Sequence, residues 1–263
     1  MTLDAQGLSI PGRLDAVSLS LRAGEVTAIL GANGAGKTTA IRMLCGLLQP
    51  SSGSGKVAGC DIQTETDRIR SRIGYMPQKF ALYPDFSVEM NLQLCGGLYG
   101  LQGDVLRTRM ETVGKLLSLE PLLSRRTDSI PWGWQQRLNL ACAILHQPEI
   151  VFLDEPTASV DPVSRRQFWD IIAELAASGT TIFVTSHYMD EVEYCGRVAI
   201  LVQGGLAALD SPAGLKKTYG HTSLGDVFLD VVERAQTRGT AAGDRARRAR
   251  SAVRASRPAS RSP

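Results

Sequence analysis

Hydrophobic residues in this chain follow two different periods, and the shorter period predicts strands. "VSLSL" (17–21) alternates apolar and polar side chains, which predicts a strand with one buried face. Three other stretches are apolar almost throughout, as in strands buried on both faces: 25–30, 150–154 and 180–187. "VAILVQGGLAALDS" (198–211) predicts a hairpin that turns at its central glycines.

Helical periodicity fills the segments between these strands. After the strand at 25–30, apolar residues at i, i+3, i+4 and i+7 predict one buried helix face: Ile41, Leu44, Cys45 and Leu48. Residues 86–123 and 133–146 are expected to be mostly helical. Another helix is expected after Asp161 and Pro162, an N-cap and first-turn pair. Its predicted buried face consists of Phe168, Ile171, Ile172 and Leu175.

One polar segment interrupts this alternation near the start of the chain. "PSSGSG" (50–55) is expected to break the chain, and a short strand is expected around "KVAGC" (56–60). The other strands alternate with helices, and the chain shows no internal repeat. This order predicts an α/β layered fold with a largely parallel sheet.

Composition is that of an ordinary globular protein. The chain has 263 residues, 43% hydrophobic and 21% charged, enough for one large domain or two modest ones. Its five cysteines include no CxxC pair, which fits a reducing cytoplasm better than disulfides or a zinc site. No signal peptide is recognisable, and no apolar run approaches the ~18 residues of a membrane span. We therefore expect a cytoplasmic chain that does not itself cross a bilayer.

Charge is distributed unevenly along the chain. The formal net charge is +3, but residues 234–263 contain nine Arg and one Asp, so the preceding body is mildly acidic. This Ala-, Ser- and Pro-rich tail has too few large apolar residues to bury, and we expect it to be disordered. Contact of the tail with anionic lipid headgroups is an alternative. No aromatic residues are interleaved with the arginines, so no specific nucleic-acid binding is expected.

A glycine-rich loop carries the strongest chemical signal. "GANGAGKT" (31–38) matches GxxxxGK[ST] between a predicted strand and a predicted helix. Backbone N–H groups of such a loop surround phosphates, and the helix N-terminus adds its positive dipole end. Lys37 is expected to reach the β- and γ-phosphates, and Thr38 is expected to ligate Mg²⁺. The predicted nucleotide-binding residues are Gly31, Ala32, Asn33, Gly34, Ala35, Gly36, Lys37, Thr38 and Thr39.

Two carboxylates stand at the end of the strand at 150–154. Asp154 and Glu155 lie where ligands bind in open α/β sheets. Asp154 is expected to hold Mg²⁺ through water, and Glu155 is expected to polarise the attacking water in phosphoryl transfer. Two adjacent acids could instead begin a turn, but the neighbouring phosphate loop favours the catalytic interpretation.

Three further polar residues are candidates for the nucleotide site only because of their order and spacing along the chain. Gln78 lies in "GYMPQ", where its amide could meet Mg²⁺ and the water. His187 ends the strand at 180–187, where it could position the γ-phosphate or the water. Asp161 lies in "ASVDP" and is a candidate nucleotide contact. Alone, such a His is usually structural and such a Gln usually lies on the surface.

Together these motifs resemble the nucleotide-binding domain of an ATP-binding cassette (ABC) transporter. The resemblance covers roughly residues 8–232 and rests on five motifs in order: "GANGAGKT", "MPQ", "GWQQRLNLACAILHQPEIVFLDEP", "ASVD" and "TSH". "YMPQKFALYPDFSVEMNLQLCGGLYGL" and "DEPTASVDP" are most similar to ATPase subunits of ABC-2 type multidrug and antibiotic exporters.

The resemblance implies a fold and a set of partners. The expected fold is that of a P-loop NTPase, with a RecA-like core (1–78 and 147–232) and a small antiparallel β part. A helical subdomain (79–146) is expected to carry the signature motif. The implied cofactors are ATP and Mg²⁺. The resemblance also implies a dimer of two ATPase subunits, alike or different, that encloses two ATP molecules. Each ATP lies between the P-loop of one subunit and the signature motif of the other. The two ATPase subunits drive separate permease subunits, so the chain is expected at the cytoplasmic face of the membrane.

The signature motif departs from the family pattern. Aligned to LSGGQ, the chain has Ile130, Pro131, Trp132, Gly133 and Trp134. Pro131 lacks the serine hydroxyl, and losing one transition-state donor typically costs ~10²–10³ in rate. A working variant is still favoured, because proline suits a first helical turn and Gly133 with the helix dipole could face an anion. The form "PxG[WF]xQR" also resembles the signature of some drug-exporter ATPases.

A second departure concerns the nucleobase. This family usually stacks adenine on an aromatic residue before the P-loop, yet residues 1–74 contain no Phe, Trp or Tyr. Leu8 or Ile10 is expected to offer aliphatic contact instead. We therefore expect weaker ATP affinity and poorer discrimination against GTP than the family usually has.

Two alternatives to an exporter ATPase remain open at this point. One is a soluble ABC ATPase acting on ribosomes or other nucleic-acid assemblies, to which the Arg-rich tail lends some weight. The other is a catalytically weak subunit that pairs with a more active homologue, for which the altered signature is the argument. A GTPase is disfavoured because no NKxD motif follows the P-loop.

Overall fold

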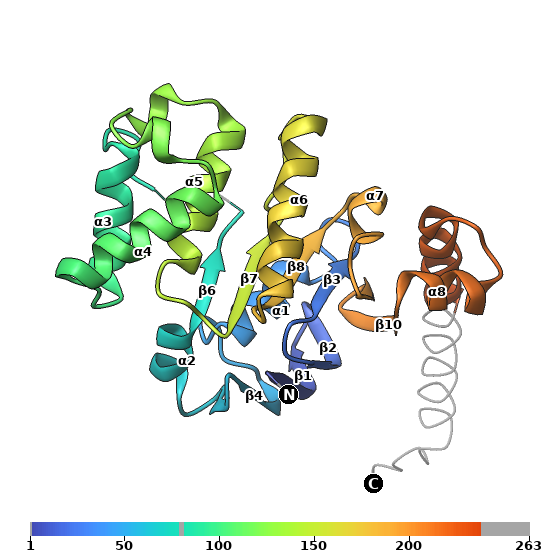
Figure 1. Ribbon diagram of the computed structural model, residues 1–263. Helices are drawn as coiled ribbons and strands as arrows, with labels where there is room; N and C mark the ends of the chain where they lie inside the picture. The colour runs from blue at the N-terminus through green and yellow to red at the C-terminus, as the bar shows by residue number, and fades with distance from the viewer. Residues whose placement is uncertain (1, 79–81, 238–263) are drawn as a thin grey trace, which may run out of the picture.

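Parallel strands form the middle of a ten-stranded sheet. The computed structural model describes residues 2–78 and 82–237, and the strand order is β5-β4-β1-β2-β10-β9-β3-β8-β7-β6 (Figure 1). The parallel strands are β3 (Val26–Leu30), β6 (Ile73–Met76), β7 (Ile150–Asp154), β8 (Thr181–Ser186) and β9 (Arg197–Val202). β3 pairs with β8 and β9, while β7 pairs with β8 and β6, all in parallel. The carboxyl ends of these strands therefore share one edge.

Antiparallel strands extend the sheet on the side of β9. They are β1 (Leu3–Ile10), β2 (Leu14–Leu21), β4 (Ser52–Val57) and β5 (Cys60–Asp61), joined through β10 (Gly205–Asp210). β9 and β10 form the predicted hairpin.

The prediction for residues 50–60 is wrong in its bounds. β4 begins at Ser52, inside the expected break, and the chain turns at Ala58–Gly59 before β5. Pairing with β1 outweighs the glycine-rich composition, since β4 is in register with β1 from Ser52 to Val57. Gly53 permits this close pairing, because a Cβ there would lie 2.4 Å from the carbonyl oxygen of Gly7.

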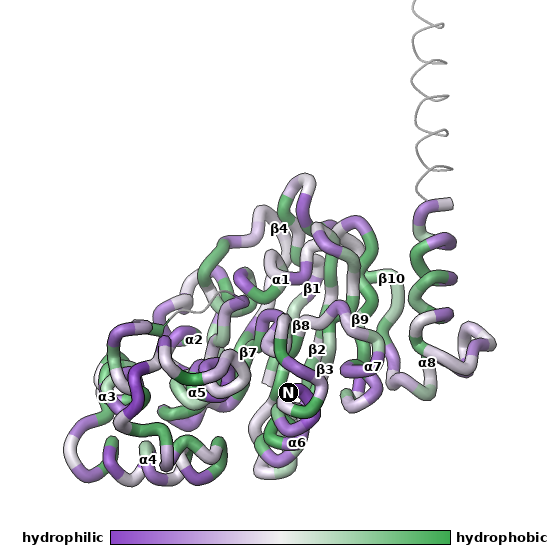
Figure 2. Tube along the Cα trace, turned by 90° about the horizontal axis from the view of Figure 1, so that it is seen from above, coloured by the Kyte–Doolittle hydropathy of each residue, from purple (hydrophilic) through white to green (hydrophobic). Residues whose placement is uncertain are grey.

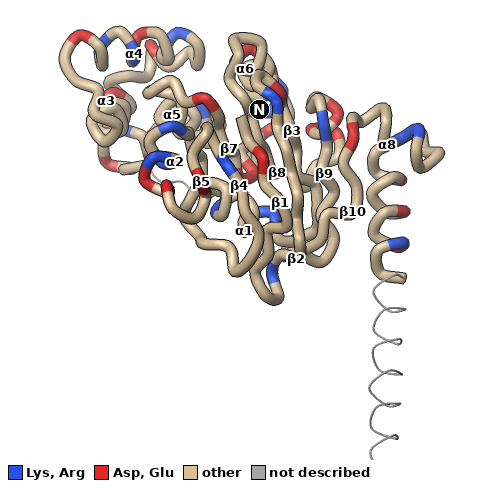
Figure 3. Tube along the Cα trace, turned by 90° about the horizontal axis from the view of Figure 1, so that it is seen from below, with Lys and Arg blue, Asp and Glu red and all other residues tan. Residues whose placement is uncertain are grey.

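Helices α1 to α8 surround the sheet, and a further helical segment follows them in the described part of the chain. They are α1 (Lys37–Leu44), α2 (Thr66–Arg72), α3 (Val88–Leu98), α4 (Gly103–Leu116), α5 (Trp132–Ile144), α6 (Pro162–Ala177), α7 (Met189–Val192) and α8 (Pro212–Tyr219). Short 3₁₀ turns occupy Glu120–Leu122 and Thr127–Ser129. Helices α3, α4 and α5 gather beyond the β6 edge of the sheet, where the helical subdomain is expected (Figure 1). Residues of both charge signs lie along α4 (Figure 3).

Two hydrophobic cores cover the two faces of the sheet. One contains the predicted buried face of α6, joined by Trp169, and extends into α5 and α3. The other packs α1 against the strands and the antiparallel part. β7 and β8 contribute to both cores, because alternate residues point to opposite faces: Leu153 and Val184 to the first, Phe152 and Phe183 to the second. Hydrophobic colours accordingly mark the strands in the middle of the molecule (Figure 2).

The C-terminal part of the described chain is helical. Residues 224–237 form a helix after α8, and the Arg234 guanidinium donates to the Asp230 carboxylate at 2.5 Å and 2.8 Å. Arg234, the first arginine of the predicted tail, therefore lies on this helix. The remainder of that tail, 238–263, lies outside the described residues.

Candidate nucleotide-binding site

The phosphate loop joins β3 to α1, as its motif requires. At two positions of the loop, only glycine fits for steric reasons. A Cβ on Gly31 would lie 2.8 Å from the carbonyl oxygen of Leu201. Gly36 is the N-cap residue of α1 with φ 105°, and a Cβ there would lie 2.8 Å from the carbonyl oxygen of Arg13. The loop can therefore curl tightly at the N-terminus of α1 only with glycine at these positions.

Lys37 lies folded back across the loop. Its Nζ donates to the carbonyl oxygens of Gly31 at 2.8 Å and Ala32 at 3.3 Å. The same Nζ lies 3.5 Å from Oε1 of Glu155, and the Lys37 side chain is only 5% exposed. A buried ammonium with one carboxylate neighbour is well placed to meet a phosphate anion.

Asp154 occupies the end of β7 directly beside the loop. Its Oδ1 accepts hydrogen bonds from the hydroxyls of Thr38 at 3.2 Å and Thr185 at 2.8 Å. Burial raises the pKa of the Asp154 carboxyl, while the hydrogen bonds from Thr185 and Thr38 oppose that rise. A carboxylate next to a hydroxyl suits Mg²⁺, which typically takes few protein oxygens and fills its other positions with water and phosphate.

Glu155 brings together three side chains from different parts of the sequence. Gln78 Nε2 donates to Glu155 Oε2 at 3.0 Å, His187 Nδ1 lies 3.4 Å from that oxygen, and Lys37 approaches Oε1. The backbone holds Glu155 in the left-handed region at φ 50°, and its N–H donates to Thr185 Oγ1 at 2.9 Å. This conformation aims the carboxylate at the phosphate loop rather than along the sheet.

A cleft of about 500 Å³ opens above these residues. Nine of the residues that line it were predicted site residues: Asn33, Gly34, Gly36, Lys37, Thr38, Thr39, Gln78, Glu155 and His187. Gly12 and Arg13 complete the lining. Gly31, Ala32 and Ala35 belong to the loop but do not line the cleft, and Ala35 is buried. Asp154 does not line the cleft, but it accepts a hydrogen bond from Thr38, which does.

Gly12 and Arg13 were not expected from the sequence. They lie in the turn between β1 and β2, where the Arg13 N–H donates to the Ile10 carbonyl oxygen at 3.0 Å. No motif contains them. The one available signal is "PG" at Pro11–Gly12, which predicts a turn but not what the turn approaches.

The adenine contacts proposed for Leu8 and Ile10 fare differently. The expectation for Leu8 is wrong, because its side chain is buried in the core with 1% exposure. Irregularities on both sides of Leu8 in the β1–β2 pairing accompany this inward orientation. Ile10 is half-buried and does not line the cleft.

Pro131, Gly133 and Asp161 lie outside the cleft. Pro131 is the N-cap residue of α5 rather than part of its first turn, and its side chain makes no cap hydrogen bond. Gly133 faces α6, since a Cβ there would lie 3.2 Å from Ser164 Cβ. Trp132 Nε1 donates to the Ala158 carbonyl oxygen at 3.1 Å, which ties α5 to the segment after Glu155. Asp161 caps α6 by accepting from the N–H groups of Val163 and Ser164.

No helix in the described ranges is both long and apolar enough to span a membrane.

The fold and the loop together define a P-loop NTPase of the α/β class. A family model described as ABC transporter matches residues 14–158, which is more than half of the chain. The chain therefore belongs to the ABC transporter family, whose ATP-binding cassettes couple ATP hydrolysis to transport.

Known relatives agree with this membership. The probable multidrug ABC transporter ATP-binding protein YbhF of Escherichia coli (strain K12) is 44% identical over 216 residues, 82% of this chain and 37% of YbhF. The linearmycin resistance ATP-binding protein LnrL of Bacillus subtilis (strain 168) is 37% identical over 82% of this chain and 68% of its own. The matched part of this chain thus spans well under half the length of YbhF.

A solved structure supports the fold. The ATP-binding subunit of an ABC transporter superposes with a TM-score of 0.79 at 26% identity, covering 88% of this chain and 99% of that subunit. The predictions of family and fold class are confirmed.

Proposed function

We propose that this chain binds Mg-ATP in the cleft and hydrolyses it to power an ABC-2 type exporter through a separate membrane permease. The observation that carries the proposal is the group around Glu155. Its carboxylate lies within 3.5 Å of Lys37, Gln78 and His187 at the mouth of the phosphate loop. Such a constellation is what in-line attack of water on a γ-phosphate needs.

Each side chain has a distinct part in the proposed reaction. Lys37 and the N-terminus of α1 hold the β- and γ-phosphates against the loop. Glu155 accepts a proton from the attacking water, which Gln78 and His187 keep in line with the γ-phosphorus. Thr38 and Asp154, with Gln78 at the edge, would hold Mg²⁺, which when bound neutralises charge on the β- and γ-phosphate oxygens.

The cargo is proposed to be a drug or another small hydrophobic molecule. The support comes from the relatives, which include a probable multidrug transporter protein and a linearmycin resistance protein. In this arrangement the cargo contacts the permease, and the chain lies peripherally at the cytoplasmic face of the membrane. The arginine-rich tail could add contacts with anionic lipid there.

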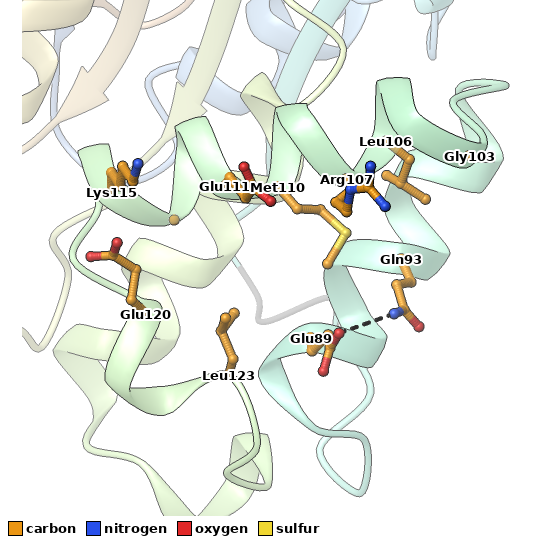
Figure 4. Close-up of a pocket in the computed structure, with 11 residues that line it drawn as sticks. Glu89, Gln93, Gly103, Leu106, Arg107, Met110, Glu111, Lys115, Glu120 and Leu123 are labelled. Carbon is orange, nitrogen blue, oxygen red and sulfur yellow. Dashed lines mark hydrogen bonds between the residues drawn. The ribbon is translucent and has the colours of Figure 1, made fainter.

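The helical subdomain offers a surface for the permease. Met90, Leu94 and Leu98 recur every four residues along α3 and are 46%, 36% and 77% exposed. Next to this row, α3, α4 and the turn after α4 surround a second cavity of about 610 Å³. Figure 4 shows Leu106, Met110 and Leu123 facing this cavity, with Glu89, Arg107 and Glu120 around it. An apolar row beside a cavity with charged borders fits a helix from a membrane subunit.

A second ATPase subunit is proposed to complete the nucleotide site. Pro131 and Gly133 lie away from this chain's own cleft, so they could contact nucleotide only on a partner. The altered signature also favours a second arrangement, in which this chain is the weaker subunit of a heterodimer. The sequence at Pro131 and Trp132 is the specific observation behind that alternative.

Binding and turnover test the catalytic part of the proposal. We expect the purified chain to bind Mg-ATP and release phosphate, and Lys37→Ala to lose both. Lys56→Ala is the matched control, because Lys56 is exposed on β4 and lies outside the cleft. Equal ATP affinity in wild type and Lys37→Ala would overturn the proposed site.

The export part needs a cellular readout. In a strain lacking the gene, we expect sensitivity to hydrophobic antibiotics to rise. The wild-type gene should restore resistance, whereas a gene carrying Glu155→Gln should not. Restoration by both genes would separate any resistance from ATP hydrolysis and overturn the export proposal.

A further inference from the structure

The nucleotide cleft has two chemically different ends. Along the shared sheet edge, Gln78 follows β6, Glu155 follows β7, His187 follows β8 and the phosphate loop follows β3. Besides Lys37 at the loop itself, the side chains suited to the γ-phosphate therefore lie on the β8 side of the loop. On its other side lie β9 and the turn that carries Gly12 and Arg13. A nucleotide with its γ-phosphate near Glu155 must extend its nucleoside towards that turn.

Arg13 is held firmly at this end of the cleft through its backbone. Pro11 and Gly12, with φ 71° at Gly12, form the turn, and the neighbouring Leu14 is buried. The Arg13 carbonyl oxygen packs so closely on Gly36 and Gly204 that a Cβ on either glycine would lie 2.8 Å away. Gly204 in turn donates its N–H to the Ala35 carbonyl oxygen at 3.1 Å. The turn is thus fixed against the phosphate loop itself.

The Arg13 side chain is available for a ligand. It is exposed, and within residues 2–78 and 82–237 no hydrogen bond or ion pair involves its guanidinium. Among the described residues that line the nucleoside end of the cleft, it has the largest planar group, since its neighbours there are glycines and Asn33, whose side-chain amide is smaller. Guanidinium planes stack well on nucleobases and aromatic faces.

We infer that Arg13 stacks its guanidinium on the base of the bound nucleotide. The inference rests on the proposed ATP binding and assigns the base end of that same cleft. Stacking uses the π-face, which every base has, so it binds adenine and guanine alike. Arg13 therefore supplies affinity without base selectivity, in agreement with the poor ATP-versus-GTP discrimination expected from the sequence.

An alternative role for Arg13 is to neutralise a phosphate. Calorimetric titration with Mg-ADP and with Mg-pyrophosphate separates the two roles, because only ADP has a base. Stacking predicts that Arg13→Ala weakens Mg-ADP binding about tenfold and leaves pyrophosphate binding unchanged. Arg13→Tyr should keep ADP affinity near the wild-type value, since it replaces one stacking plane by another. Arg13→Lys should resemble Arg13→Ala, because it keeps the charge and loses the plane.

Several results would overturn the inference. One is unchanged ADP affinity in Arg13→Ala, and another is equal loss of ADP and pyrophosphate affinity that Arg13→Lys restores. Arg22→Ala, at another exposed arginine outside the cleft, serves as the control and should bind both ligands as wild type does. If the wild-type chain binds neither ligand, the proposed nucleotide site fails and the role of Arg13 fails with it. If the wild-type chain binds both ligands and Arg13→Ala binds them equally well, the stacking role of Arg13 is refuted and the proposed nucleotide site stands.

Discussion

The phosphate loop and the start of α5 differ in how many side chains of this same chain contact them. Around the loop, side chains from four strand ends meet, and Glu155 contacts Lys37, Gln78 and His187. At the start of α5, Pro131 makes no cap hydrogen bond, and Trp132 Nε1 donates to the Ala158 carbonyl oxygen.

The difference indicates which half of the proposed mechanism is built within one chain. The residues around Glu155 are preorganised, so their contribution does not depend on a partner. In the proposed mechanism Pro131 and Gly133, which do not line this chain's cleft, would act across an interface, and their sequence departs most from the family pattern. Variants in each region should therefore fail in different ways.

The largest effect is expected from Glu155→Gln. Removing the proposed proton acceptor should lower steady-state phosphate release by about 10²–10⁴-fold, the usual contribution of general base catalysis. Glutamine is nearly isosteric and should preserve the backbone at φ 50° and ATP binding. Phosphate release and ATP affinity are measured on the same preparation.

Glu149→Gln is the matched control for this variant. Glu149 is 59% exposed and its nearest cation is Arg72 at 3.9 Å. It should hydrolyse ATP at the wild-type rate. Full turnover in Glu155→Gln would show that another group takes the proton and would break the contrast between the two regions.

A smaller effect, an increase in ATP turnover, is expected from Pro131→Ser. Serine restores a hydroxyl donor and can cap α5, which starts at Trp132 without a side-chain cap. We expect turnover to rise about tenfold, a fraction of what one oxyanion donor typically contributes. The readout is phosphate release at saturating Mg-ATP, with size-exclusion chromatography to follow dimer formation.

Pro131→Ala isolates the hydroxyl in this experiment. It removes the ring and gains the same backbone N–H as serine but no hydroxyl, so it should leave turnover near the wild-type value. An equal rise in both variants would assign the effect to the loss of the ring or to the backbone N–H gained, and not to the hydroxyl. A decrease in Pro131→Ser would indicate that the present signature is already the better one.

Local motifs explain why so much of the site could be predicted from the sequence. The phosphate loop and the pair Asp154–Glu155 each follow a buried strand, and parallel strand ends meet at one edge. Gln78 and His187 reach Glu155 by the same rule. Gln78, Glu155 and His187 lie together because β6, β7 and β8 are neighbours in the sheet, and the resemblance to the family implies that order.

Contacts set by tertiary pairing could not be predicted in this way. Arg13 adjoins the phosphate loop because the β1–β2 turn packs on Gly36 and Gly204, which are distant in sequence. Leu8 turns inward where the pairing of β1 is irregular. The glycines of β4 look like a break, yet β1 uses them for close strand pairing.

The smallest predicted effect compares the starts of α5 and α6. Asp161 Oδ1 accepts from the N–H groups of Val163 at 3.1 Å and Ser164 at 3.0 Å, a cap that α5 lacks. Asp161→Ala should lower the Tm by a few degrees, whereas Asp161→Asn keeps an acceptor and should lower it less. Thermal unfolding at pH 7 compares the two variants with wild type.

The pH dependence of this cap has a definite sign. Hydrogen bonding from Ser164 lowers the pKa of Asp161 in the folded chain below its ordinary value of 3.8. The ionised cap therefore stabilises the fold above the unfolded pKa, and this stability is lost as the pH falls through the folded pKa. Asp161→Asn cannot ionise, so its Tm deficit relative to wild type should shrink on acidification.

If Asp161→Asn keeps the wild-type Tm at pH 7 but loses ATP turnover, Asp161 acts at the nucleotide of a partner subunit. In that case the start of α6 belongs functionally with α5, and the contrast between the two helix starts is one of capping alone.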